Sequence, residues 1–195
     1  MKFGIIIGVL VAAIATFGLA DTVHAVETCL SGTATVETVN SSLGTYKYTV
    51  EITWGPLPHG LSHWDLLLDL DLCEDLCTDP PIAFDDVAGY TDGEDCDTVT
   101  FEGEFQCEDD PSIPGIEGPM AKFDPIEGQS CEPDKSGSGT FCFYSDLPPA
   151  PMTVDGLIKF STENCRGPVT GMLPTCGATT GTESSSWSSV KDMFR

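Results

Sequence analysis

The stretch TYKYTVEITW (residues 45–54) carries the clearest structural signal in the chain. Large apolar side chains stand at every second position, and polar or charged side chains fill the positions between them: the apolar set is Tyr46, Tyr48, Val50, Ile52 and Trp54. Successive side chains of a β-strand point to opposite faces. The stretch therefore predicts a strand with one buried face and one solvated face.

The same alternation returns in HWDLLLDLDL (residues 63–72), after the turn sequence GPLPHG. One face would carry the apolar residues Trp64, Leu66, Leu68, Leu70 and Leu72, and the other Asp65, Leu67, Asp69 and Asp71. Helical spacing would scatter these aspartates around the axis, so the pattern favours a strand. Further strands are predicted at residues 29–39, 98–105, 120–123, 140–144 and 152–160.

Seven or eight strands separated by loops rich in Gly, Pro and Asp predict an all-β fold. We expect an antiparallel β-sandwich, with an immunoglobulin-like Greek key as the first choice and a jelly roll as the second. This domain would span residues 26–176.

Both ends of the chain separate from this domain. Residues 1–25 have the pattern of a signal peptide: Lys2, an apolar run over residues 3–20, and small residues before a cleavage site after Ala25. A retained membrane anchor is the alternative, but no Lys or Arg follows until Lys47, as a stop-transfer flank would need. We therefore expect export, with no membrane insertion after cleavage.

At the other end, residues 177–186 have linker composition, and residues 187–195 form a short amphipathic tail. A helix would place Trp187, Val190 and Phe194 on one face, so they are the candidate docking residues of the tail. The alternative is a disordered tail.

The charge balance narrows the choice of partners. The chain has 8 basic and 31 acidic residues, and its net charge is −23. Nucleic acid and anionic membrane surfaces would repel such a chain. The acidity favours cations: bound calcium, a cationic partner surface, or a saline medium that screens the repulsion.

Nine cysteines in an exported chain predict disulfides rather than a thiolate metal site. The candidate pairs, each closing a short loop, are Cys131–Cys142, Cys165–Cys176 and Cys73–Cys77. Cys96 and Cys107 cannot pair across a single extended strand, which would hold them roughly 35 Å apart. The odd number leaves one thiol free or bonded to a second chain, and Cys29 is the candidate for a covalent dimer.

Acidic clusters are the candidate calcium ligands. The loop DGEDCD offers Asp92, Glu94, Asp95 and Asp97, and the strand 63–72 adds Asp69 and Asp71. The acids miss the EF-hand spacing, and a solvated acidic surface is the alternative, as it is for residues 108–110.

The two histidines beyond the signal peptide, His59 and His63, lie in PHGLSHW. They suggest a metal pair, or His63 with Ser62 and Asp65 as part of a hydrolase. No Gly-x-Ser-x-Gly or His-Glu-x-x-His motif accompanies them. We therefore interpret them as turn and strand-edge residues, and we expect no catalytic residues.

Two resemblances point to the cell exterior. The run Tyr46-x-Tyr48-x-Val50 with the following LSHW (residues 61–64), FD (123–124) and GTFCF (139–143) resembles uncharacterised secreted bacterial β-sandwich domains of cell surfaces. The last nine residues resemble the Trp-x-x-Val-Lys-x-Met-Phe-Arg tails of some secreted bacterial proteins. These resemblances imply a surface or matrix role and carry over no functional residue.

Together these patterns predict a secreted, acidic cell-surface or matrix protein with a structural or binding role, stabilised by calcium and without enzymatic activity. A carbohydrate-binding module, with a polysaccharide as its partner, is the first alternative, and a secreted hydrolase is the second.

Overall fold

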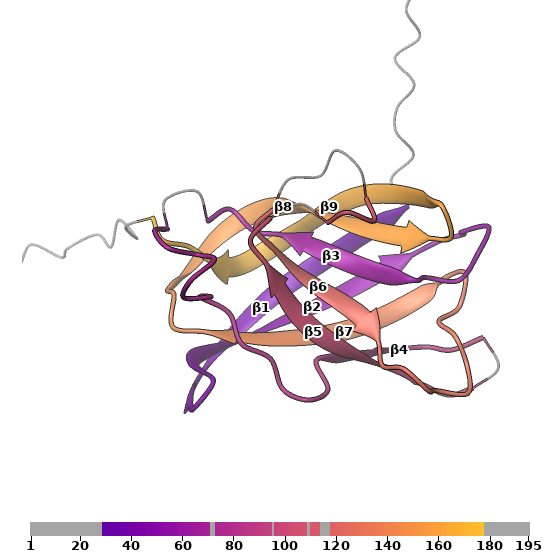
Figure 1. Cartoon of the computed structure of the whole chain (residues 1–195), viewed down its shortest axis with the longest axis horizontal. Helices are drawn as coiled ribbons and strands as arrows, with labels where there is room; N and C mark the ends of the chain where they lie inside the picture. Colours follow the sequence, from indigo (N-terminus) through magenta and orange to yellow (C-terminus); the bar gives the residue numbers. More distant parts are fainter. Residues whose placement is uncertain (1–28, 71–72, 95, 109, 114–117, 178–195) are drawn as a thin grey trace, which may run out of the picture.

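A computed structural model describes residues 29–70, 73–94, 96–108, 110–113 and 118–177 of the chain. The predicted signal peptide, the tail 187–195 and, apart from Gly177, the linker 177–186 lie outside these residues. The described residues form nine β-strands (Figure 1): β1 (Leu30–Ser41), β2 (Gly44–Trp54), β3 (His63–Leu67), β4 (Gly89–Thr91), β5 (Val99–Gln106), β6 (Met120–Pro125), β7 (Gly137–Ser145), β8 (Pro149–Phe160) and β9 (Glu163–Pro174).

The strands close into one barrel in the order β1-β2-β7-β4-β5-β6-β3-β8-β9. All neighbouring strands run antiparallel except β1 and β9, which run parallel and pair Gly32 with Val169 and Ala34 with Gly171. In Figure 1, β3, β5 and β6 lie in front of β1 and β2. The predicted all-β class is confirmed. The sandwich and the jelly roll are wrong, because one continuous sheet closes on itself instead of splitting into two.

The inner faces of the strands supply the core, and aromatic rings fill the barrel. The Trp64 ring stacks on Phe123 with 4.8 Å between ring centroids, and it meets the edge of Phe141 at the same distance. Tyr48 stacks on Phe143 at 5.1 Å. These side chains are fully buried, so the barrel interior is a packed core.

The predicted inner face of β2 is confirmed for Tyr48, Val50, Ile52 and Trp54, which are buried, while Tyr46 at its start is half-buried. The strand expected over residues 63–72 ends earlier, at Leu67, although Leu68 and Leu70 remain buried. The stretch between Cys165 and Cys176, predicted to be a loop that their disulfide closes, lies mostly in β9 instead.

Four disulfides fasten the barrel, and they differ from every predicted pair: Cys29–Cys165, Cys73–Cys176, Cys77–Cys107 and Cys96–Cys131. Cys165 and Cys176 cannot pair because β9 occupies most of the chain between them, which is the geometry that also separates Cys96 from Cys107 across β5.

The remaining cysteine assignments also change. Cys131 lies in a loop whose residue Pro133 bridges Gly93, and this contact places it beside Cys96 rather than Cys142. Cys73 and Cys77 do not close a small loop, because each is bonded to a distant segment. Cys29 is not free, and the unpaired thiol belongs to Cys142.

No helix within the described part of the chain has the length and apolar character needed to cross a membrane.

Candidate functional site

The most unusual polar cluster lies on the outer face of the barrel wall, where β3 runs between β6 and β8. Because side chains alternate along β3, Trp64 and Leu66 point into the core while His63 and Asp65 point outward. The strand register places Lys159 of β8 opposite His63 and Lys122 of β6 opposite Asp65. The strand register therefore places His63 and Asp65 beside two lysines on one patch of the outer face.

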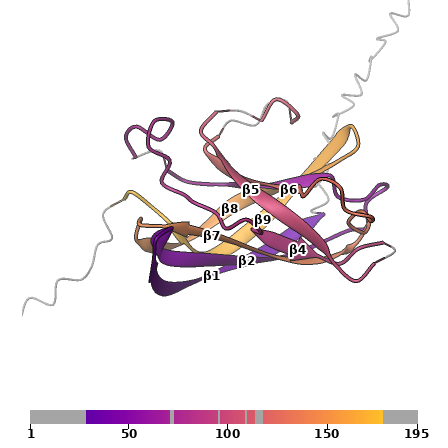
Figure 2. The same cartoon turned by 60° about the horizontal axis from the view of Figure 1, so that its bottom comes forward.

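The loop between β5 and β6 covers this patch. Figure 2 shows its described residues standing beyond the ends of β5 and β6. Ile113 of the loop is fully buried and packs with Met120, Leu157 and Leu67 in a second, small hydrophobic cluster outside the barrel. This cluster holds the loop against the wall. The prediction that Asp65 faces solvent is therefore wrong, since the loop leaves its side chain 0% exposed.

Two residues of the loop complete the cluster. The Ser112 amide donates a hydrogen bond to Asp110 Oδ1 at 2.7 Å, and the Ile113 amide donates one to the Asp110 carbonyl at 3.0 Å. This local turn aims the second carboxylate oxygen of Asp110 at β3. The Cys77–Cys107 disulfide fixes the chain where the loop begins.

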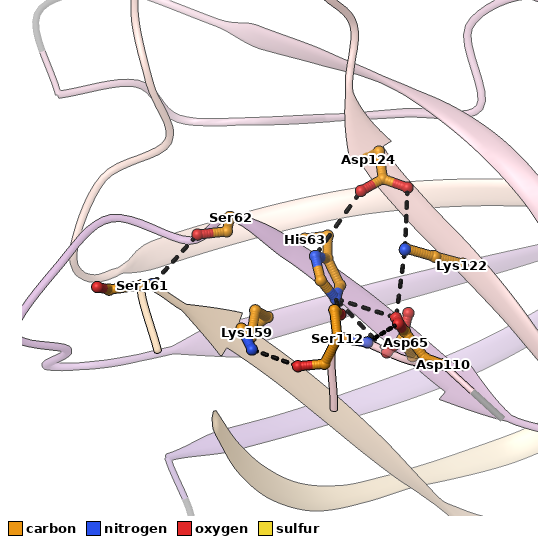
Figure 3. Close-up of polar contacts among 9 residues, drawn as sticks. All are labelled: Ser62, His63, Asp65, Asp110, Ser112, Lys122, Asp124, Lys159 and Ser161. Carbon is orange, nitrogen blue, oxygen red and sulfur yellow. Dashed lines mark hydrogen bonds and ion pairs between the residues drawn. The ribbon is translucent and has the colours of Figure 1, made fainter. Parts of the chain in front are cut away.

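His63 lies at the centre of the cluster (Figure 3). Its Nε2 atom is 3.2 Å from Ser112 Oγ, 3.3 Å from Asp110 Oδ2 and 3.8 Å from Asp65 Oδ2. Its Nδ1 atom, on the other side of the ring, is 3.7 Å from Asp124 Oδ1. The imidazole is thus surrounded by oxygen atoms on both sides.

Two lysines border this group of oxygen atoms. Lys122 Nζ lies 3.2 Å from Asp110 Oδ2 and 3.7 Å from Asp124 Oδ2. Lys159 Nζ donates to the carbonyl oxygen of Ser112. One lysine therefore balances part of the carboxylate charge, and the other holds the backbone of the covering loop.

Asp65 is the member of the cluster that is left without partners. Both of its carboxylate oxygens are buried and have no hydrogen-bond donor among the described residues. Burial, and then repulsion from Asp110, raise the pKa of Asp65 to about 7. A buried carboxylate in this state is costly, and native structures normally provide it with a donor or a cation.

The pKa values of the neighbouring groups are shifted by burial and by their contacts. Burial, together with the positive charge of Lys122, lowers the pKa of His63 to about 4, so its ring is neutral at neutral pH. Burial opposes the charge on Asp110, but the hydrogen bonds from Ser112 and the ion pair with Lys122 hold its pKa below the usual range. Burial raises the pKa of Asp124.

This arrangement has two chemical interpretations. His63, Asp65 and Asp110 form a group that could hold a metal ion, with one ligand atom from each lying within 4.8 Å of the others. Ser112, His63 and Asp124 also have the order of a hydrolytic triad. The triad is poorly set up, because Asp124 is beyond hydrogen-bond distance and a histidine with a pKa near 4 is a weak base at neutral pH.

The residues singled out from the sequence lie elsewhere, except for His63 and Asp65. His59 is exposed on the preceding loop, as expected for a turn residue, while His63 is buried at the start of β3. Ser62 is not the serine beside His63; its Oγ accepts a hydrogen bond from the Ser161 amide instead. The hydrolase fragment of Ser62, His63 and Asp65, an alternative that the sequence analysis sets aside, does not form.

The proposed calcium ligands do not converge where the structure describes them. Asp92 accepts a hydrogen bond from Ser138, Glu94 pairs with Lys135 at 3.4 Å, and Asp69 and Asp97 are exposed. Asp71 and Asp95 lie outside the described residues. Calcium in the 92–97 loop stays a prediction.

Sequence reasoning missed Asp110, Ser112 and the two lysines. Asp110 belongs to the acidic run 108–110, which looked like a solvated surface. The available signal was the His-x-Asp spacing of His63 and Asp65, which puts both side chains on one face of a strand.

No protein-family model matches this chain, and no curated protein is similar to it.

Proposed function

We propose that this chain is an exported structural or binding protein of the cell surface or extracellular matrix, and that it does not catalyse a reaction. The observation that carries the proposal is the closure of its most reactive-looking cluster: the covering loop leaves His63 only 6% exposed. The barrel interior is filled by aromatic side chains, so partners would meet the outer surface and its loops.

The disulfides support an extracellular setting. Four bonds join segments that are distant in sequence, which is typical of proteins from oxidising compartments. The net charge of −23 gives the outer surface an affinity for cationic partners that salt would weaken. A carbohydrate-binding module is less well supported, because it needs a row of exposed aromatic rings and Tyr90 is the one exposed aromatic side chain among the described residues.

Localisation can be tested by labelling intact cells that produce the full chain with a membrane-impermeant amine reagent. The Lys135 side chain is 50% exposed and provides a target. We expect the chain to be labelled before lysis, while a cytoplasmic marker stays unlabelled. Labelling that requires lysis would contradict the proposal.

The non-catalytic part of the proposal has its own test, since Ser112 lies 3.2 Å from His63 Nε2 and a hydrolase is the second candidate. We expect no hydrolysis of activated esters by the purified chain. Hydrolysis that is lost in Ser112→Ala but kept in Ser62→Ala, a matched exposed serine, would establish the hydrolase instead.

A further inference from the structure

The buried carboxylate of Asp65 is a group that a bound cation would stabilise. Its two oxygens are fully enclosed and have no hydrogen-bond donor within the described part of the chain, and Asp110 Oδ2, which Lys122 Nζ approaches to 3.2 Å, is buried beside them. Lys122 supplies one positive charge close to three carboxylates, those of Asp65, Asp110 and Asp124. A divalent ion would add positive charge beside carboxylates that the lysines of the cluster do not fully neutralise.

The spacing of the donor atoms fits a small, tetrahedrally coordinated ion. With metal–ligand bonds of about 2.0–2.1 Å, neighbouring ligand atoms of a tetrahedral zinc site stand about 3.3–3.4 Å apart. From His63 Nε2, the distances to Asp110 Oδ2 and Ser112 Oγ are 3.3 and 3.2 Å, and the distance to Asp65 Oδ2 is 3.8 Å. The ligand atoms of His63, Asp65 and Asp110 all lie within 4.8 Å of one another, so small side-chain adjustments would bring these three atoms to this spacing.

The types of ligand atom indicate which metal the site would bind. Calcium and magnesium take oxygen ligands almost exclusively, whereas an imidazole nitrogen combined with carboxylates suits zinc. In such sites a carboxylate commonly accepts a hydrogen bond from the second ring nitrogen of the histidine. Asp124 lies on that side of the His63 ring, 3.7 Å from Nδ1 and so just beyond hydrogen-bond distance, and the Ser112 amide fixes the orientation of Asp110.

From these contacts we propose that His63, Asp65 and Asp110 bind one zinc ion, with the fourth position beside Ser112 Oγ. Two ligands come from β3 and the third from the covering loop, so the ion would fasten the loop to the barrel wall. The site is structural, because it is closed to solvent on the side of the loop. It is independent of the proposed surface role and lies away from the acidic loop 92–97.

The first test is thermal unfolding of the full chain after export, with its disulfides intact and without a histidine tag. Because the site is covered, the protein is refolded from denaturant with zinc, calcium, magnesium or chelator before the measurement. We expect zinc at a hundredfold excess over its Kd to raise the midpoint by about 5–10 °C relative to chelator. Calcium and magnesium at equal concentration should not match this shift. No zinc shift, or an equal shift with calcium, would overturn the proposal.

Variants then locate the site. His63→Gln and Asp65→Asn should lose the zinc shift, while their matched controls His59→Gln and Asp69→Asn, which alter exposed residues of the same types, should keep it. Asp65→Asn should fold at least as well as the parent in chelator, because it removes an uncompensated buried charge. A zinc shift that survives in Asp65→Asn would refute this assignment.

A count of bound metal gives a readout that does not depend on stability. Equilibrium dialysis should find one tightly bound zinc per chain in the parent, and none in Asp65→Asn. Cobalt in place of zinc should give the intense visible absorption of a tetrahedral site. Tight binding lost in His59→Gln instead would place zinc on the surface and sink the proposal.

Discussion

In metal-free protein, Asp65→Asn is expected to change how stability depends on pH, in a direction opposite to His63→Gln. The pKa of Asp65 is raised from 3.8 to about 7 in the folded protein, so the folded state holds this proton more tightly than the unfolded chain. The stability that Asp65 contributes is therefore present below about pH 4 and lost as the pH rises through 7. This pKa difference corresponds to about 4 kcal/mol of unfolding free energy.

His63 acts in the opposite sense. Its pKa is lowered from 6.5 to about 4, so the unfolded chain takes up its proton first as the pH falls. The stability from keeping this ring neutral is present above pH 6.5 and lost as the pH falls towards 4, with a size of about 3 kcal/mol. Between about pH 4 and 7, the stability lost through Asp65 and the stability gained through His63 nearly cancel in the parent.

The assay is urea denaturation followed by tryptophan fluorescence, in chelator, at several pH values between about 4 and 7.5. Subtracting the curve of each variant from that of the parent removes the titration of the surface carboxylates. We expect the free energy of the parent relative to Asp65→Asn to fall with rising pH, and that relative to His63→Gln to rise. Asp69→Asn is the exposed control and should run parallel to the parent. A pH-independent difference between the parent and Asp65→Asn would refute the reasoning.

Three further changes test the packing and the cysteine assignment. Ile113→Ala empties the small cluster under the covering loop and is expected to lower the unfolding free energy by about 2–5 kcal/mol; in denaturation, a loss under about 1 kcal/mol would show that the loop is not held there. Gly103→Ala places a methyl group against the Phe84 ring and is expected to lower the thermal midpoint through a loss of about 1–3 kcal/mol, so an unchanged midpoint would contradict the packing. Cys142→Ser removes the unpaired thiol, and any reducible dimer on a non-reducing gel should disappear; a dimer that persists would have to use one of the eight bonded cysteines.

Local pattern predicts the strands of this protein well, because alternation depends only on neighbouring residues. The buried face of β2 follows directly from TYKYTVEITW. Alternation reports that one face is buried, however, and does not report whether that face lines a barrel or the gap between two sheets. Closure depends on a contact between β1 and β9, which lie at opposite ends of the described residues, so no local signal could distinguish the barrel from a sandwich.

The stretch between Cys165 and Cys176 was predicted to be a loop, and its glycines serve the strand that it forms. A β-carbon at Gly167 or Gly171 would collide with the backbone of Leu30 or Ala34 in β1. Glycine inside a strand often marks such a close approach of two backbones. These glycines therefore allow β9 to complete the barrel.

Only the β3 part of the candidate site could be predicted from the sequence. His63 and Asp65 share one face of a predicted strand, but their burial depends on a loop that arrives about forty-five residues later in the chain. Within that loop, Ile113 is a hint of packing among acidic and turn-forming residues. Asp110 could not be distinguished from its acidic neighbours in the sequence, because its role depends on contacts with His63 and Lys122 that only the structure shows.

The parallel pairing of β1 and β9 also governs the order of events when the chain folds. The Cys29–Cys165 disulfide beside this seam joins residues 136 positions apart, so the first strand has no second neighbour until the last strand has been delivered. Until then β1 offers an open edge to any other extended chain, which is a hazard for aggregation. Such long-range closure is slow compared with the formation of hairpins. Under the export that we propose, this delay would keep the barrel open while the chain crosses the membrane.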